Sequence, residues 1–196
     1  MRRLVLASTS RYRRQLLERL GHPFDVLAPD IDETPLPGEF PAATALRLAV
    51  AKARAVAARV GDALVIGSDQ VADADGVPVS KPGDHASAVA QLRTLSGRTI
   101  VFHTAVALVD AASQRCETRL VDVRSTFRAL SLEAIEHYLL REQPYDCAGA
   151  VKSEALGIAL FERIESDDPT ALIGLPLIAL TDLLLNQGVD VLVRDC

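Results

Sequence analysis

The sequence has few cysteines, and none is placed where a covalent or metal cross-link would need it. Cys116, Cys147 and Cys196 are odd in number and widely separated, and the chain contains no Cys-x-x-Cys pair. The four histidines are scattered as well. This pattern supports neither a disulfide framework nor a zinc site. We therefore expect the protein to reside in a reducing compartment.

Long apolar runs are also missing. The N-terminal run covers only residues 4–7 and is followed by polar and basic residues, which is unlike a secretory signal. The later apolar stretch, residues 172–185, is too short to cross a bilayer and contains Asp182. The sequence therefore predicts a cytoplasmic protein with no membrane segment.

Positive charge is scarce too. The chain has 21 Lys and Arg against 26 Asp and Glu, a net charge of −5. This balance argues against a nucleic-acid polymer as partner. Any anion must be met by a local group of Lys and Arg inside an acidic protein, which favours a small phosphorylated ligand.

The chain has an ordinary globular composition and an ordered pattern of elements. Its 196 residues can bury a large core, as one domain or as two lobes that share a cleft. The predicted strands are 4–7, 24–27, 63–67, 99–109, 117–127 and 157–161, with a hairpin turn at 75–76. The predicted helices begin after Ser10 and Ser131 and cover 42–60, 85–95 and 176–187. Because strands alternate with helices at first and then pair as neighbours, we expect an α/β fold with a mixed twisted sheet flanked by helices.

The first strand leads through small hydroxyl residues into a basic helix. Ser8-Thr9-Ser10 separates the strand from that helix, and Arg13 and Arg14 follow. Free backbone N–H groups, hydroxyls and the positive end of the helix dipole then point at one spot, which is a site for an anion. We expect Arg13 and Arg14 to add positive charge at this spot. An ordinary turn with Ser10 as the N-cap explains the same residues.

Asp69 follows a strand predicted to be buried on both faces. An acid at such a position is held rigidly at the crevice where α/β proteins bind ligands. It is suited to accept a proton from water or to hold a divalent metal. The alternative is an acid that only makes hydrogen bonds within a turn.

Two lysines and a second acid complete the inventory. Lys52 lies on the margin of the apolar face of helix 42–60, which we assign to Leu46, Ala49, Val50, Ala53, Ala57 and Val60. Its flanking apolar neighbours fit either a snorkelling side chain or a phosphate ligand in a cleft. Lys81 follows the hairpin and is either a solvated lysine on a surface loop or a second ligand for an anion. Glu33, in the acidic loop 29–41, is a surface charge or a magnesium ligand. Together these groups match metal-assisted hydrolysis of a phosphoanhydride.

Across nearly its entire length the chain resembles the Maf family of nucleoside triphosphate pyrophosphatases. The resemblance is carried by short motifs in family order. They are Leu6-Ala7-Ser8-Thr9-Ser10 with Arg13-Arg14, Asp32-Glu33-Thr34, Arg47-Leu48-Ala49 with Lys52-Ala53, Gly67-Ser68-Asp69-Gln70, Lys81-Pro82, Leu95-Ser96-Gly97, Cys147-Ala148-Gly149, Lys152-Ser153-Glu154 and Gly174-Leu175-Pro176-Leu177.

The resemblance implies a reaction and a set of residues. It implies cleavage between the α and β phosphates of a nucleoside triphosphate, with the position of Asp69 activating water and a divalent cation, usually Mg²⁺, as cofactor. It places Ser8, Arg13, Glu33, Lys52 and Lys81 at the substrate, with Glu33 and Asp69 as metal candidates. It also implies one two-lobed domain over residues 1–196, similar to inosine triphosphatases, with lobes around a central cleft and a possible homodimer.

The resemblance also implies a substrate, through Tyr12, Gln70 and Glu154. This set resembles the branch of the family that acts on 7-methyl-GTP, although that branch commonly has Trp at the first position. The dTTP and UTP branch has Arg, Thr and Gln there. Methylation at N7 leaves a positive charge on the purine, which favours stacking on an aromatic ring. A carboxylate such as Glu154 accepts from N1–H and the N2 amino group of guanine and balances that charge.

Two other functions stay open from the sequence. One is a house-cleaning pyrophosphatase for other nucleotides such as dTTP and UTP. The other is a nucleotide-binding regulator of septation that needs no turnover. The acids beside the basic cluster favour an enzyme, because a protein that only binds a triphosphate needs no base to activate water.

Overall fold

We analysed a computed structural model of the chain, which describes residues 2–193; Cys196 lies outside these residues. The strands are β1 (Leu4–Ala7), β2 (Phe24–Leu27), β3 (Leu64–Ala74), β4 (Val77–Val79), β5 (Thr99–Asp110), β6 (Cys116–Phe127) and β7 (Phe161–Glu165). The α-helices are α1 (Arg11–Glu18), α2 (Pro41–Ala57), α3 (His85–Leu95), α4 (Leu132–Glu142) and α5 (Leu177–Asn186). Three short 3₁₀ turns are η1 (Ala148–Ala150), η2 (Leu156–Leu160) and η3 (Ala171–Ile173). No described helix has the length and apolar character needed to cross a membrane.

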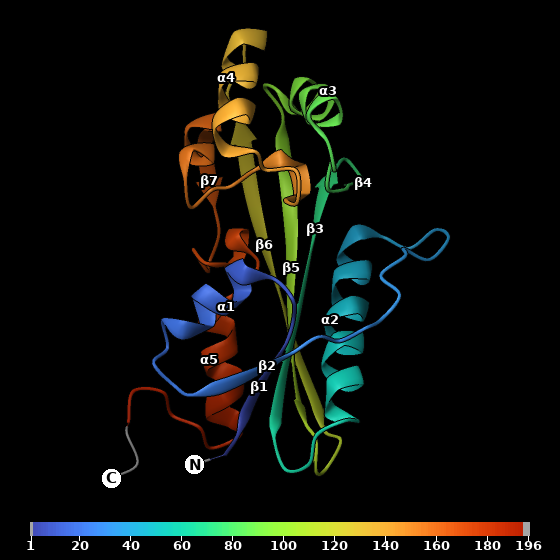
Figure 1. The fold of residues 1–196 in the computed structure, drawn as a ribbon, viewed down its shortest axis with the longest axis vertical. Helices are drawn as coiled ribbons and strands as arrows, with labels where there is room; N and C mark the ends of the chain where they lie inside the picture. Colours follow the sequence, from blue (N-terminus) through green and yellow to red (C-terminus); the bar gives the residue numbers. More distant parts are fainter. Residues whose placement is uncertain (1, 194–196) are drawn as a thin grey trace.

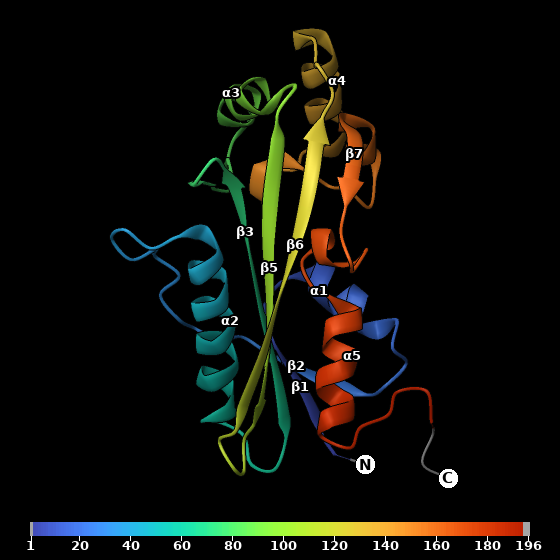
Figure 2. The same ribbon diagram turned by 180° about the vertical axis from the view of Figure 1, so that it is seen from behind.

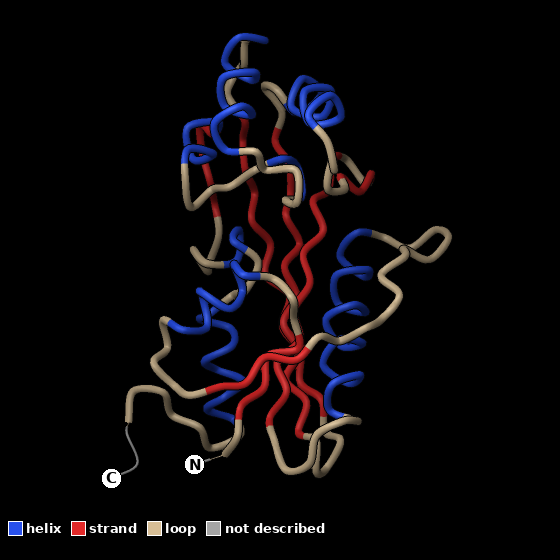
Figure 3. Tube along the Cα trace, in the orientation of Figure 1, coloured by secondary structure: helices blue, strands red, loops and turns tan. Residues whose placement is uncertain are grey.

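One mixed sheet runs through the whole elongated molecule (Figure 1). Its strand order is β2-β1-β3-β5-β6-β7, with β4 added to the far part of β3. β1 pairs in parallel with β2 and β3, and the other pairs are antiparallel. The long strands β3, β5 and β6 carry the sheet from one end of the molecule to the other. The α/β fold with a mixed twisted sheet flanked by helices is therefore confirmed (Figure 3).

The two ends of the sheet are covered differently, which gives the molecule two lobes. At the end that holds both termini, α2 packs on one face and α1 and α5 on the other, each with its own apolar core (Figure 2). At the opposite end, α3, α4 and the η1 and η2 turns share a third core with β5, β6 and β7. The segments between these cores form the walls of the cleft described below.

Very close packing holds α2 against β3. A Cβ atom built on Gly67 would lie 2.2 Å from the Ala49 carbonyl oxygen, so only glycine fits there. The face of α2 that packs on the sheet carries Ala45, Ala49 and Ala53, all fully buried. Small side chains let the helix backbone approach the strand, and this approach brings the next turn of α2 beside the strand that carries Asp69.

The structure corrects several predicted boundaries. α2 ends at Ala57 rather than at residue 60. Its buried face includes Leu48, Lys52 and Val56, while Leu46 and Val50 are only partly buried, so the helix is rotated relative to the predicted face. β3 continues to Ala74, which places Asp69 within the strand rather than at its end.

The late strand predicted at 157–161 is also wrong. Residues 156–160 form a 3₁₀ turn, and the strand begins only at Phe161. The buried positions Gly157 and Leu160 are three residues apart, which matches a 3₁₀ turn. The hairpin turn at 75–76 is confirmed, and both Asp75 and Gly76 have the positive φ that a tight hairpin requires.

Candidate active site

A cavity of about 880 Å³ opens where the two lobes meet. It is lined by eight of the nine site residues predicted from the sequence. These are Ser8, Tyr12, Arg13, Glu33, Lys52, Asp69, Gln70 and Lys81. The ninth, Glu154, lines an adjoining cavity of about 100 Å³ whose wall also includes Tyr12, Arg13, Gln70 and Lys81. Residues from distant parts of the sequence therefore converge on one continuous cleft.

The turn between β1 and α1 forms one wall of the cleft. Ser10 caps α1, because its Oγ accepts a hydrogen bond from the Arg13 backbone N–H at 3.4 Å. The Ser8 Oγ accepts from the Ser10 N–H at 3.0 Å, and Ser8 is buried. The capped turn expected from the sequence is confirmed. The same geometry aims the start of α1 at the cavity, where helix N–H groups favour an anion.

Arg13 is held in position by a loop from the other end of the sequence. Its Nε donates to the Gly174 carbonyl oxygen at 2.8 Å, and the Ser68 Oγ donates to the same oxygen at 2.9 Å. Burial lowers the pKa of Arg13, while the charges of Asp69 and Glu33 act in the opposite direction. Gly174, which belongs to one of the family motifs found in the sequence, thus holds a cation at the cleft.

Arg14, the neighbour of Arg13 on α1, does not enter the cleft. It forms an exposed ion pair with Glu18, one helical turn along, at 3.0 Å. The side chains of residues 13 and 14 leave a helix about 100° apart, so only one of the two can face the cleft. The sequence interpretation that both arginines add charge at one spot is therefore wrong for Arg14.

Lys52 joins the two acids of the cavity. Its Nζ lies 2.7 Å from Asp69 Oδ1 and 2.8 Å from Glu33 Oε2. Lys52 and Asp69 are both buried, whereas Glu33 is half-exposed at the mouth. Because an ammonium has three N–H donors, one remains for a ligand after both carboxylates are bound. Lys52 is thus not a snorkelling surface side chain, and its position suits both carboxylate and phosphate.

Glu33 is positioned by a network that the sequence did not reveal. Arg47 of α2 forms a two-point ion pair with Glu39, with both N–O distances at 2.7 Å, and also donates to the Thr34 carbonyl oxygen. The Glu39 carboxylate accepts from Thr44 Oγ1 as well. The Arg47 hydrogen bond lowers the pKa of Glu39 to about 2. The part of the acidic loop that follows Glu33 is therefore fastened to α2.

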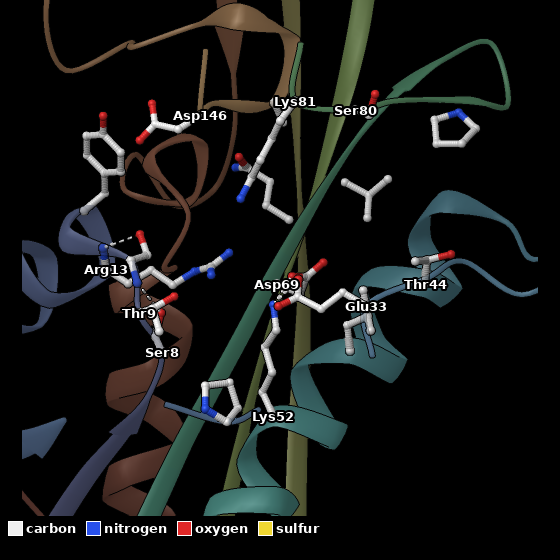
Figure 4. Close-up of a pocket in the computed structure, with 18 of the residues that line it drawn as sticks. Ser8, Thr9, Arg13, Glu33, Thr44, Lys52, Asp69, Ser80, Lys81 and Asp146 are labelled. Carbon is white, nitrogen blue, oxygen red and sulfur yellow. Dashed lines mark hydrogen bonds and ion pairs between the residues drawn. The ribbon is translucent and has the colours of Figure 1, made fainter. Parts of the chain in front are cut away.

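Lys81 enters the cleft from the other lobe. It follows β4, is exposed, and extends into the cavity (Figure 4). The Gly83 N–H donates to the Tyr145 carbonyl oxygen at 3.0 Å, which ties this loop to segment 144–148. Asp146 of that segment lines both cavities, and sequence reasoning did not single it out.

The three residues expected to read the base lie together around the smaller cavity. Gln70 donates its Nε2 to Thr104 Oγ1 and to the carbonyls of Ala171 and Leu172, so its amide nitrogen is already engaged. Tyr12 is half-buried, and burial raises its pKa to about 12. Glu154 is exposed at the rim.

Only a limited set of groups could hold a metal ion. Among residues 2–193, no group of three or more His, Cys, Asp or Glu side chains has the arrangement of a metal site. Glu33 and Asp69 supply two carboxylates, and Mg²⁺ commonly takes one or two carboxylates with water and phosphate oxygens in its other positions. The residues present therefore fit an ion that arrives with a phosphorylated ligand.

The fold and the cleft define a two-lobed α/β protein in which basic side chains line the central cavity around a buried acid. The chain belongs to the Maf-like protein family, whose sequence model matches residues 3–187. It is 61% identical to the 7-methyl-GTP pyrophosphatase of Thiobacillus denitrificans over 189 residues, which cover 96% of this chain and 94% of the relative. It is 60% identical to the 7-methyl-GTP pyrophosphatase of Ralstonia nicotianae, covering 93% and 94% of the two chains.

Solved structures show a more distant similarity. The crystal structure of a nucleoside-triphosphatase described as a dITP/XTP pyrophosphatase, from Mycobacterium abscessus, is 19% identical with a TM-score of 0.45. The match covers 65% of this chain and 75% of that one.

Proposed function

We propose that this protein is a pyrophosphatase that cleaves 7-methyl-GTP between its α and β phosphates, releasing 7-methyl-GMP and pyrophosphate. The identity of about 60% to relatives of that name, over nearly the full length of both chains, supports the substrate. The single structural observation that carries the reaction is the buried Asp69 paired with Lys52 in a cleft that Arg13 and Lys81 also line.

Asp69 acts as the base in this proposal. Lys52 binds its Oδ1, which fixes the carboxylate and leaves Oδ2 for a water molecule. The water oxygen attacks one of the phosphorus atoms beside the bridging oxygen, and its proton passes to Asp69. The bond from that phosphorus to the bridging oxygen breaks, and the bridging oxygen leaves with the electron pair on the departing phosphate group.

The cations of the cleft stabilise charge on the phosphate chain. Arg13 presents a planar guanidinium suited to two phosphate oxygens, and Lys81 contributes a flexible ammonium from the opposite lobe. Glu33 and Asp69 would hold a divalent cation, proposed as Mg²⁺, which neutralises phosphate charge when bound. Donors that are in position before the reaction stabilise the developing charge without having to reorganise. Such electrostatic stabilisation is usually the largest contribution to the rate enhancement.

A nucleotide panel tests the proposal. With Mg²⁺ present, we expect pyrophosphate release from 7-methyl-GTP to exceed release from GTP, dTTP and UTP by kcat/KM. Comparable values for all four would overturn the assigned base and leave the reaction class standing. Release of single phosphate groups, or no release from any of them, would overturn the reaction class itself.

A further inference from the structure

Two carboxylates lie in the part of the cleft that we propose binds the base. Asp146 and Glu154 both line the smaller cavity. Within residues 2–193, no Lys, Arg or His forms an ion pair with either of them. Glu33 and Asp69, by contrast, both form an ion pair with Lys52. The carboxylates of Asp146 and Glu154 are therefore not engaged in an ion pair, although Arg13 and Lys81 line the same cavity.

Asp146 is held in place by the segment that carries it. The Tyr145 carbonyl accepts from Gly83 at 3.0 Å, and the Tyr145 hydroxyl lies 3.0 Å from His85 Nδ1. The Cys147 N–H donates to the Pro144 carbonyl at 3.2 Å, and the Cys147 Sγ lies 3.8 Å from the Tyr12 hydroxyl oxygen. These contacts fix the backbone on both sides of Asp146 and join it to the start of α1.

This corner of the cleft already accommodates a flat cation. The Arg11 guanidinium carbon lies 4.8 Å from the centre of the Tyr12 ring, and its Nη2 donates to the Tyr12 hydroxyl at 2.7 Å. That hydrogen bond raises the pKa of Arg11, and the charge of Asp146 adds to the effect. A guanidinium and an N7-methylated purine are both planar with delocalised positive charge, so the surroundings that favour one favour the other.

We propose that Asp146 is a specificity-determining residue that pairs with the positive charge of the N7-methylated base. This inference rests on the proposed function. Unmethylated guanine presents two acceptors, N7 and O6, on the same edge. A carboxylate there repels those lone pairs, whereas it attracts the methylated ring. Asp146 therefore favours 7-methyl-GTP and disfavours GTP, while Glu154 reads the N1–H and N2 groups that both nucleotides share.

The ratio of kcat/KM for 7-methyl-GTP to that for GTP tests this role. We expect Asp146→Asn to lower the value for 7-methyl-GTP by about tenfold, as for a lost charge-assisted contact. The value for GTP should stay the same or rise. Asp146→Glu, which keeps the charge, should retain most of the preference. Glu162→Gln makes the same charge change on the exposed strand β7, outside both cavities, and should leave the ratio unchanged.

The outcomes separate the two proposals. Equal loss on both nucleotides would place Asp146 at a part they share and overturn its role at the methylated edge. An unchanged ratio in Asp146→Asn would overturn it as well. If the wild-type protein releases no pyrophosphate from 7-methyl-GTP, the proposed function itself fails and the inference falls with it. Thermal unfolding of each variant confirms that a changed ratio does not come from a damaged fold.

Discussion

The buried position of the Lys52 ammonium depends on the carboxylates that surround it. A buried ammonium is unfavourable unless it is paired and hydrogen-bonded. Here two carboxylates, from a strand and from a loop, satisfy it. The pairing also separates two acids that would otherwise repel each other. The pairing thus holds the Asp69 carboxylate in a fixed, buried position at the cleft, where a base must stand to meet a water molecule.

Replacing Asp69 tests the chemistry at this scale. We expect Asp69→Asn to fold normally, because Lys52 keeps Glu33 as a partner. Turnover should fall by a factor on the order of 10² or more, since an amide cannot accept the proton from water. Pyrophosphate release measures the first effect and thermal unfolding the second. Asp62→Asn, an exposed acid far from the cleft, is the control and should keep wild-type turnover. Near-normal turnover in Asp69→Asn would remove Asp69 from the role of base.

At the scale of elements, the contact of α2 with β3 positions the two central charges. Gly67 lies two residues before Asp69, and Ala49 lies three residues before Lys52. The close approach at Gly67 therefore sets the distance between the helix and the strand next to the Lys52–Asp69 pair. The fold and the site depend on the same packing at this point.

A methyl group at Gly67 should disturb both the packing of α2 on β3 and the position of the Lys52–Asp69 pair. We expect Gly67→Ala to lower the free energy of unfolding by about 3 kcal/mol, because its Cβ would overlap the backbone of α2. Chemical denaturation measures this loss. Gly61→Ala is the matched control, since its Cβ would meet nothing within 4 Å, and its effect should stay within about 0.5 kcal/mol. Equal stability of the two variants would contradict the close approach.

The acidic loop depends on Glu39, which leads to a prediction about pH. The folded-state pKa of Glu39 is lowered from 4.5 to about 2 by its ion pair with Arg47. A lowered pKa means that its contribution to stability is complete above about pH 4.5 and is lost as the pH falls toward 2. Glu39→Gln should therefore be less stable than wild type at pH 7, and the difference should shrink between pH 4.5 and 2. Urea denaturation at pH 7, 4 and 3 measures it. A constant difference across this range would contradict the assignment.

At the scale of the whole molecule, the cleft is built from both lobes. Lys81 and Asp146 come from one lobe, and Ser8, Arg13 and Lys52 from the other. We expect a nucleotide bound between them to hold the lobes together, because its contacts with both lobes exist only in the folded state. Ligand binding should therefore stabilise the fold as a whole.

Unfolding of the Asp69→Asn protein tests this point, because its expected slow turnover limits consumption of the nucleotide during the measurement. With Mg²⁺ and 7-methyl-GTP at about 100 times its Kd, we expect about 2.7 kcal/mol of added stability. Thermal unfolding with and without nucleotide measures the shift. An unchanged midpoint at saturating nucleotide would show that the cleft does not bind it.

Local patterns in the sequence predicted most of the elements. The Ser10 cap, the Asp75-Gly76 turn and the strands around residues 4, 24, 64, 100 and 120 were all predictable, because each depends on neighbouring residues. The boundaries of β3 and the turn at 156–160 were not, because pairing with β5 and contact with Lys152 decide them. The roles of Glu39 and Gly174 were not predictable either, because their hydrogen-bond partners lie 8 and 161 residues away in the sequence.

The sequence by itself determined the family, the reaction type it implies and the types of residue in the cleft, because short motifs in a fixed order carry that information. Tertiary structure alone decided that Lys52 faces inward between two acids, that Arg13 and not Arg14 enters the cleft, and that Asp146 stands beside Tyr12. These facts depend on the rotation of helices and on contacts between distant segments, which only packing of the whole chain can fix.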